Sequence, residues 1–294
     1  MRLRERALAL VVVVHGVGQQ LEGELTLHNR FFSALKQGVT RADGTIGPDD
    51  VVFASYGEFF RPAAEVLSPL PYFDEESIEE GYESELLLAL WQRAAEVDPQ
   101  VVPPDEEVLG RSPVWASQAL AALSRSRYFA GVADSLLVGN LKQVHWYFTD
   151  AALRAKIRQA VAGLVSADTR VVVAHSLGSV AAYEALCALP ERPALSFVTL
   201  GSPLGLPNLI FDRLDPAPRP AGAAVRGHWP ACARFWTNIA DAGDVVAMVE
   251  DLRPLFGPEM RQIRVHNGAH AHDLGAYLTE PLTGKAIVAG LHDG

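Results

Sequence analysis

The chain lacks the features of small disulfide-bonded, membrane-spanning and nucleic-acid-binding proteins. Its 294 residues include two cysteines, Cys187 and Cys232, too few for a disulfide framework or a cysteine-rich zinc module. The sequence has no run of about 18 uninterrupted apolar residues, so we expect no transmembrane segment. The formal net charge of -10 argues against a nucleic-acid partner, whose phosphates need a basic surface. On these grounds we expect a cytoplasmic protein.

Apolar residues are abundant and form short runs that alternate with helical patterns. Hydrophobic residues make up 49% and charged residues 20% of the chain, which is enough to bury a large core. The alternation predicts an α/β protein with a mainly parallel sheet and helices on both faces. The predicted strands are residues 7–14, 51–55, 170–174, 196–200, 234–240 and 262–265. The predicted helices are residues 25–36, 141–165, 177–189 and 285–291.

The first apolar run, residues 7–14, follows Arg2, Arg4 and Arg6 and so has the outline of a signal peptide. However, the run is short, rich in valine, and not followed by a small-residue cleavage motif. We therefore interpret it as a buried strand.

Two stretches break the alternation, and we interpret both as insertions into a single domain that spans residues 1–294. The first, at about residues 57–139, is rich in proline and carries seven carboxylates between Asp74 and Glu85. We expect short helices and loops there that form a cap or lid, with the acidic run on a solvated face. The second, at about residues 204–230, is rich in proline and glycine and is expected to be irregular. The aromatic residues of the first insertion either form the core of the cap or line an acyl-chain pocket.

A serine directly after a buried strand is the strongest chemical signal. Valines at 171–173 and Ala174 lead through His175 to Ser176, and a helix of small residues follows. A sharp strand-to-helix turn exposes a serine oxygen at the sheet edge when small residues stand two before and two after it. Gly178 fits this pattern, whereas Ala174 stands where glycine is usual. The alternative is that Ser176 only caps the helix. The buried strand before it favours the interpretation as a nucleophile.

A second signal is the loop His15-Gly16-Val17-Gly18 after the first predicted strand. Loops at the carboxyl ends of parallel strands are where such sheets bind ligands. A dinucleotide site would need a third glycine where Leu21 stands and a carboxylate about 20 residues further on. No acidic residue lies between Leu25 and Ala42. We therefore expect neither a dinucleotide nor another cofactor.

Three motifs follow predicted strands: His15-Gly16-Val17-Gly18, Ala174-His175-Ser176-Leu177-Gly178 and Thr199-Leu200-Gly201-Ser202-Pro203. Together they resemble the α/β-hydrolase superfamily, in particular its lipases and esterases. The resemblance covers the sheet segments and not the two insertions. It implies an α/β-hydrolase fold with a helical cap, and triad partners that follow the serine in the order acid, then histidine.

By this resemblance the acid follows the strand at 234–240, where Asp241 and Asp244 are candidates. Asp244 precedes two valines, as in the lipase pattern of an acid followed by hydrophobic residues, and we favour it. Asp241 is better placed to cap the turn. Asp212 and Asp215, in the second insertion, are weaker candidates.

The candidate bases are His266, His270 and His272. His272 opens a segment that resembles the lipase loop in which the base precedes a tyrosine and a helix, so we favour His272 over His270. The cluster of His270, His272 and Asp273 also permits a metal site. Because neither a helical H-E-x-x-H motif nor a cysteine pair supports one, we expect no metal.

These residues predict acyl-transfer chemistry. We expect Ser176 to attack a carbonyl, His272 to accept its proton and Asp244 to orient His272. We expect the backbone N–H groups of Val17 and Leu177 to hold the oxyanion. The residues expected to support the loop are His15, Gly16 and Gly18.

We therefore expect a serine hydrolase that cleaves a small-molecule carboxylic ester with an apolar acyl group, with peripheral lipid contact as a compatible property. An acyltransferase or amidase on the same triad stays open as an alternative. A non-catalytic binding module on the same fold is disfavoured, because serine, acid and base candidates occur in the required order. The sequence does not indicate an oligomeric state.

Overall fold

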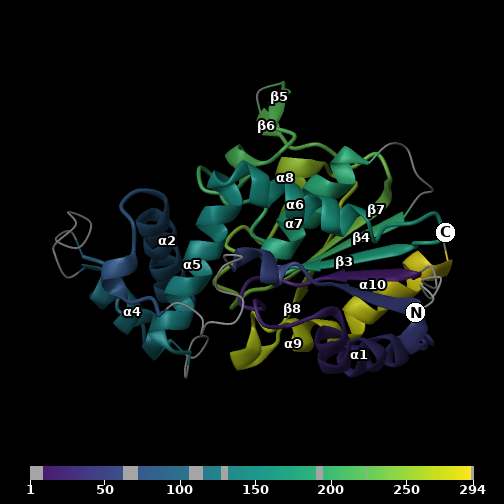
Figure 1. The fold of residues 1–294 in the computed structure, drawn as a ribbon, viewed down its shortest axis with the longest axis horizontal. Coiled ribbons are helices and arrows are strands. Elements are labelled where there is room, and N and C mark those ends of the chain that lie inside the picture. Colours follow the sequence, from purple (N-terminus) through teal and green to yellow (C-terminus); the bar gives the residue numbers. More distant parts are fainter. Residues whose placement is uncertain are drawn as a thin grey trace.

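The computed structural model describes residues 9–61, 72–105, 115–126, 132–189, 195–222 and 224–292, and its centre is a six-stranded sheet (Figure 1). The strands lie in the order β2-β1-β3-β4-β7-β8, and every neighbouring pair is parallel. The predicted α/β class with a mainly parallel sheet is confirmed. The strand bounds are β1 Val11–Val14, β2 Val51–Ala54, β3 Val171–His175, β4 Leu195–Leu200, β7 Ala233–Asp241 and β8 Arg261–Val265.

The central strands are rich in valine because both faces of the sheet are covered. Every residue of β1 and β3 is buried. Val12 and Val172 pack into the core on one face, and Val11 and Val173 pack into the core on the other. Burial of one such side chain stabilises the fold by about 1.5–3 kcal/mol, so the two strands anchor both layers of helices.

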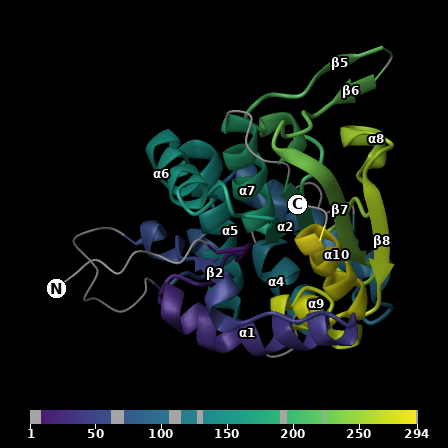
Figure 2. The ribbon, with the colours of Figure 1, turned by 90° about the vertical axis from the view of Figure 1, so that its right-hand side faces the viewer.

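Helices cover both faces, as predicted. The core on one face includes side chains of α6 (Ala151–Ala162) and α7 (Leu177–Ala188). The core on the other includes side chains of α1 (Glu24–Arg41), α9 (Leu274–Thr279) and α10 (Pro281–His292). Figure 2 shows the two layers from the side.

Three further helices, α2 (Tyr82–Val97), α4 (Trp115–Arg125) and α5 (Asp134–Thr149), lie together beyond the carboxyl ends of the strands (Figure 1). We call them the cap helices. The prediction of short helices was wrong, since they contain 16, 11 and 16 residues.

The predicted end of the first insertion near residue 139 was also wrong, because α5 continues through it. The predicted helix at 141–165 is in fact the end of α5 followed by α6. The break falls at Asp150, whose carboxylate accepts hydrogen bonds from the N–H groups of Ala152 and Leu153 at 2.9 and 3.0 Å. This is an N-cap that starts a new helix.

Other predicted bounds also differ. Strand β1 begins at Val11 rather than at residue 7, and residues 1–8, including Arg2, Arg4 and Arg6, lie outside the described part. The second insertion, predicted to be irregular, contains an exposed antiparallel hairpin that projects from the molecule (Figure 2). Its strands are β5 Arg219–Ala221 and β6 Ala224–Arg226.

The described residues also form short helices, namely α8 Arg253–Phe256 and the 3₁₀ turns Pro48–Asp50, Gly57–Phe60, Glu75–Ser77, Phe211–Arg213 and Gly268–His270.

None of the described helices is both long and apolar enough to cross a membrane.

The sheet order brings the two strongest sequence motifs together. Strands β1 and β3 are neighbours, yet the chain leads from β1 to β2 on one side and from β3 to β4 on the other. Val14 pairs with Ala174, so the loops that follow the two strands start side by side. Parallel sheets bind ligands at the carboxyl ends of such a pair.

Candidate active site

Ser176 stands at the turn between β3 and α7 with a backbone φ of 53° and ψ of -134°. A residue other than glycine in this conformation costs about 1–3 kcal/mol and persists where its surroundings hold it. Here the Ser176 N–H donates to the Leu200 carbonyl at 3.1 Å, and the Ser179 N–H donates to the Ser176 carbonyl at 2.9 Å. The Ser176 hydroxyl does not cap α7, so it is free to serve the site.

The turn packs tightly against the glycine loop after β1. A Cβ added to Gly178 would lie 2.0 Å from the His15 carbonyl oxygen, and one added to Gly16 would lie 2.7 Å from the Ser176 Cβ. Both positions therefore require glycine, whereas the buried methyl group of Ala174 fits where glycine is usual. This close contact holds the glycine loop directly beside Ser176.

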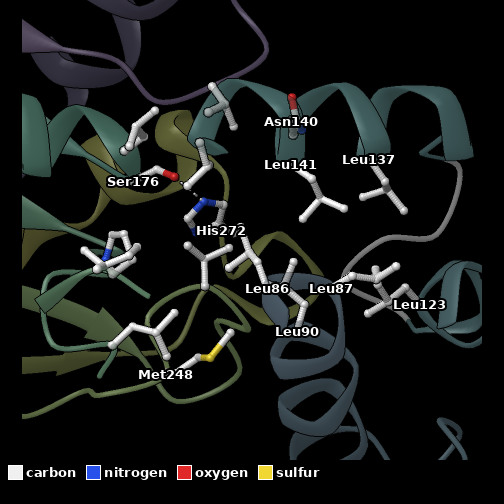
Figure 3. Close-up of a pocket in the computed structure, with 17 residues that line it drawn as sticks. Leu86, Leu87, Leu90, Leu123, Leu137, Asn140, Leu141, Ser176, Met248 and His272 are labelled. Atoms are coloured by element: carbon white, nitrogen blue, oxygen red, sulfur yellow. Dashed lines mark hydrogen bonds between the residues drawn. The ribbon is translucent and has the colours of Figure 1, made fainter. Parts of the chain in front are cut away.

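The three predicted triad residues form a series, in which His272 lies within hydrogen-bond distance of both Ser176 and Asp244. His272 Nε2 lies 3.0 Å from Ser176 Oγ (Figure 3). On the other side of the ring, His272 Nδ1 lies 2.9 Å from Asp244 Oδ2. A carboxylate that accepts from Nδ1–H fixes the tautomer whose Nε2 can take a proton from the serine.

Asp244 is fully buried and accepts hydrogen bonds on both oxygens. The N–H groups of Val246 and Ala247 donate to Oδ1 at 2.9 and 3.2 Å, and the Tyr277 hydroxyl donates to Oδ2 at 2.8 Å. Burial by itself would raise the pKa of Asp244, but the imidazole of His272 and these donors together hold it below its usual value. Asp244 therefore stays charged beside His272.

Tyr277 is a part of the site to which the sequence analysis assigned no role. Besides donating to Asp244, its hydroxyl accepts the N–H of Asp241 at 2.9 Å. Burial and the charge of Asp244 raise the pKa of Tyr277 well above its usual value, so the hydroxyl remains a donor. The short segment between His272 and Tyr277 is the signal that could have identified this residue.

Asp241, the rival acid, holds the turn instead. Its carboxylate accepts the Gly243 N–H at 2.7 Å and also the N–H of Asn267. Both oxygens thus face backbone donors, in line with the expected turn-capping role.

The other candidates are not part of this hydrogen-bonded series. His266 and His270 are exposed, and among the described residues no side-chain hydrogen bond joins either of them to Ser176, His272 or Asp244. Asp212 accepts the N–H of Asn208, and Asp215 pairs with Arg158.

Two buried histidines lie beneath the triad. His175 Nε2 lies 3.0 Å from the His272 carbonyl oxygen, and burial together with the neighbouring His272 lowers the pKa of His175 to about 3. His15 Nδ1 donates to the Gly16 carbonyl at 2.6 Å, its ring stacks on Tyr56 at 4.2 Å, and burial lowers its pKa to about 4. His15 therefore stays uncharged, and its hydrogen bond and ring stacking hold it against the glycine loop.

Two backbone N–H groups beside Ser176 have no partner among the described residues. These are the N–H groups of Val17 and Leu177, the predicted oxyanion donors. Leu177 is the first residue of α7, where the helix offers no carbonyl to accept its N–H. The N–H of Gly18, in contrast, donates to Gln143 Oε1 of α5 at 3.2 Å, a contact that the sequence analysis missed.

Ser176 and His272 open onto a pocket between the sheet and the cap helices, which we call the apolar pocket (Figure 3). Aliphatic side chains dominate its wall, and Leu123 and Leu137 lie at the end away from Ser176 (Figure 3). The aliphatic lining residues are Val17, Leu86, Leu87, Leu90, Leu123, Leu137, Leu141, Val144, Leu177, Leu206, Ile210 and Val246.

None of the described aromatic residues between positions 57 and 148 lines this pocket, and Tyr128 and Phe129 lie outside the described residues. Trp91 and Tyr147 are buried in the hydrophobic core, and the Trp91 indole N–H donates to the Val102 carbonyl at 2.7 Å. For these described residues, the interpretation as core residues holds rather than the interpretation as the lining of an acyl-chain pocket.

One cap helix is tied to the loop that carries Asp244. Arg93 of α2 donates from Nη2 to the Ala242 carbonyl at 3.1 Å and to Glu250 Oε1 at 3.2 Å. Arg93 therefore joins α2, which forms part of the wall of the apolar pocket, to the loop that carries Asp244. This contact was not predicted from the sequence.

Within the described residues, the one cluster with the spacing of metal ligands is Glu79, Glu83 and His145 in the cap. The ammonium group of Lys142 lies 2.9 Å from Glu83 and 3.1 Å from Glu79, and His145 Nδ1 lies 2.6 Å from Glu83. A cation is already present between these carboxylates, so the cluster is an ion-pair network that is buried at Glu83 and Lys142 and exposed at Glu79.

A scan of the chain against protein-family models finds no match, and a search of curated proteins finds no significant similarity.

Proposed function

We propose that the chain is a serine hydrolase of the α/β-hydrolase fold that cleaves carboxylic esters with an apolar acyl group. One observation carries the proposal: Ser176, His272 and Asp244 form a hydrogen-bonded series, with distances of 3.0 and 2.9 Å, at the end of the apolar pocket. Nucleophile, base and orienting carboxylate in this arrangement are the parts of an activated serine.

The positions of the three residues in the fold support the same proposal. Ser176 follows β3, Asp244 follows β7 and His272 follows β8, so all three lie at the carboxyl ends of the strands. Their order along the chain is serine, acid, histidine, which is the order in α/β-hydrolases. The left-handed backbone of Ser176 corresponds to the strained serine turn of that fold.

The reaction proceeds in two steps. Ser176 Oγ attacks the ester carbonyl while His272 Nε2 takes the hydroxyl proton, and the C–O bond to the alcohol breaks as His272 returns that proton to the leaving oxygen. Water, deprotonated by His272, then cleaves the acyl-serine bond and releases the acid. The N–H groups of Val17 and Leu177 stabilise the oxyanion in both steps, and Asp244 stabilises the imidazolium.

The test is hydrolysis of p-nitrophenyl decanoate by the wild type and by Ser176→Ala. We expect turnover by the wild type and a loss of about 10⁵-fold or more in kcat for Ser176→Ala. Ser33→Ala, at an exposed position of α1, is the matched control and should behave as the wild type. Wild-type turnover by a folded Ser176→Ala variant would contradict the mechanism.

A further inference from the structure

A second pocket opens beside Ser176, and we call it the polar pocket. It shares four lining residues with the apolar pocket, namely Val17, Asn140, Ser176 and His272. The two pockets therefore meet at the reacting serine. An ester has two arms, an acyl group and an alcohol, and each arm has a pocket of its own.

The two pockets differ in the chemistry of their walls. The polar pocket is lined by the side chains of Gln19, Arg30, Asn140 and Asp273, which offer both donors and acceptors of hydrogen bonds. The apolar pocket offers leucines, and a hydroxyl group buried there without a partner is strongly disfavoured. The part of the substrate that carries hydroxyl groups therefore suits the polar pocket, and an alkyl chain suits the apolar pocket.

The charges of the polar pocket select a neutral group. Its wall carries one cation, Arg30, and one anion, Asp273. Arg30 is already partly compensated, since its Nη1 lies 3.8 Å from Glu22 and 3.5 Å from Gln19 Oε1. A phosphate or carboxylate in this pocket would face the carboxylate of Asp273, whereas hydroxyl groups can bond to each of the four polar side chains named above.

Asn140 of α5 lines both pockets, and Figure 3 shows it among the residues of the apolar pocket. Its half-buried carboxamide makes no hydrogen bond to any described residue. Gln143, a near neighbour on the same helix, is already bonded to the Gly18 N–H. An unpaired amide beside the nucleophile is available to bind substrate.

We propose that the polar pocket binds the alcohol part of the ester, that this alcohol is a neutral polyol, and that Asn140 and Arg30 bind its hydroxyl groups. The substrate is then a fatty acyl ester of a polyhydroxy alcohol, which His272 releases by protonating the ester oxygen. This inference rests on the proposed function, and it concerns only the alcohol arm of the substrate.

The test compares esters that share one acyl chain. They are glycerol monodecanoate, propyl decanoate and decanoyl glycerol phosphate. We expect the wild type to have a kcat/KM for the glycerol ester at least about tenfold above that for the propyl ester, because each hydrogen bond gained contributes about fivefold. The phosphate ester should be the poorer substrate of the two glycerol esters.

Asn140→Leu should lower the glycerol-to-propyl ratio by about fivefold, and Arg30→Leu should lower it as well. Arg30 is on the exposed face of α1, so its variant tests the proposal even where Asn140→Leu does not fold. The matched control is Leu90→Ala in the apolar pocket, which should lower kcat/KM for both esters equally and leave the ratio unchanged.

A wild-type ratio near one, or a ratio that neither variant changes, overturns the inference while turnover of p-nitrophenyl decanoate leaves the proposed function standing. Faster turnover of the phosphate ester overturns the assignment to a neutral alcohol. Failure to hydrolyse the three decanoyl esters while p-nitrophenyl decanoate is cleaved overturns the inference alone. Failure to hydrolyse p-nitrophenyl decanoate as well overturns the proposed function with it.

Discussion

The sheet side and the cap side of the apolar pocket are built in different ways. On the sheet side, Ser176, His272 and Asp244 are held by directional hydrogen bonds of 2.8 to 3.2 Å. On the cap side, leucines of α2, α4 and α5 offer only apolar surface. Hydrogen bonds weaken steeply with misalignment, whereas apolar burial is non-directional and scales with area. Changes on the sheet side should therefore cost orders of magnitude in kcat, and changes on the cap side should shift substrate preference.

The largest effect is expected from the base. His272→Ala removes the group that takes the Ser176 proton, so kcat should fall by about 10⁵-fold. His270→Ala is the matched control, because His270 is exposed and lies only two residues away; it should change kcat little. Steady-state kinetics with p-nitrophenyl decanoate measures both, and the reverse ranking would move the base to His270.

The next effect distinguishes the two buried aspartates. Asp244→Asn should lower kcat by about 10⁴-fold, because an amide favours the wrong imidazole tautomer. Asp241→Asn should instead lower the free energy of unfolding by about 1–3 kcal/mol, because it weakens the bonds to the Gly243 and Asn267 N–H groups. Kinetics and urea unfolding of both variants separate these outcomes. A fully active Asp244→Asn variant would remove Asp244 from the mechanism.

Stability should also depend on pH through the sheet side. Burial lowers the pKa of His15 to about 4 and of His175 to about 3, from an ordinary value of 6.5. Below pH 6.5 these two histidines bind protons in the unfolded chain but not in the folded chain. The free energy of unfolding therefore falls as the pH drops from 6.5 toward 4. Between about pH 8 and pH 5, each histidine should lower the free energy of unfolding by about 2 kcal/mol.

The variant His15→Gln tests this assignment by urea unfolding at the two pH values. Its loss of stability on acidification should be about 2 kcal/mol smaller than that of the wild type. Parallel losses in the two proteins would show that His15 is not a source of the pH dependence.

The smallest effect is expected on the cap side. Leu137 is 6% exposed and lies at the far end of the apolar pocket, whereas its neighbour Leu136 is 56% exposed. Leu137→Trp should raise KM for p-nitrophenyl decanoate by about tenfold and leave p-nitrophenyl acetate unaffected, because only the long chain reaches that end. Leu136→Trp is the matched control. Equal effects of the two variants would mean that the acyl chain does not run along α5.

The sequence was informative where the signal is local. The valine strand, the turn and Gly178 occur within eight residues of chain, so Ser176 could be identified as a nucleophile candidate from its immediate neighbours. Asp244 and His272 needed the chain order implied by the resemblance, because nothing near them in the sequence says that they meet. The parallel sheet was predictable because strands buried on both faces are apolar throughout.

The features that the sequence analysis missed depend on contacts between distant segments. Tyr277 with Asp244, Gln143 with Gly18 and Arg93 with Ala242 each join residues that are tens of positions apart or more. The cap helices were predicted as short pieces because α2 and α5 bury residues around much of their circumference, which weakens the periodic signal. The hairpin β5–β6 was missed because its exposed strands lack the alternation of a half-buried strand.

Labelling by an alkyl fluorophosphonate, followed by peptide mass spectrometry, tests directly whether Ser176 is an activated nucleophile. The nucleophile must be activated for phosphonylation, and ordinary surface serines do not react. We expect a single adduct on the peptide that contains Ser176, absent from Ser176→Ala and formed much more slowly in His272→Ala. A folded wild-type protein that is not labelled, or that is labelled at another residue, would contradict this expectation.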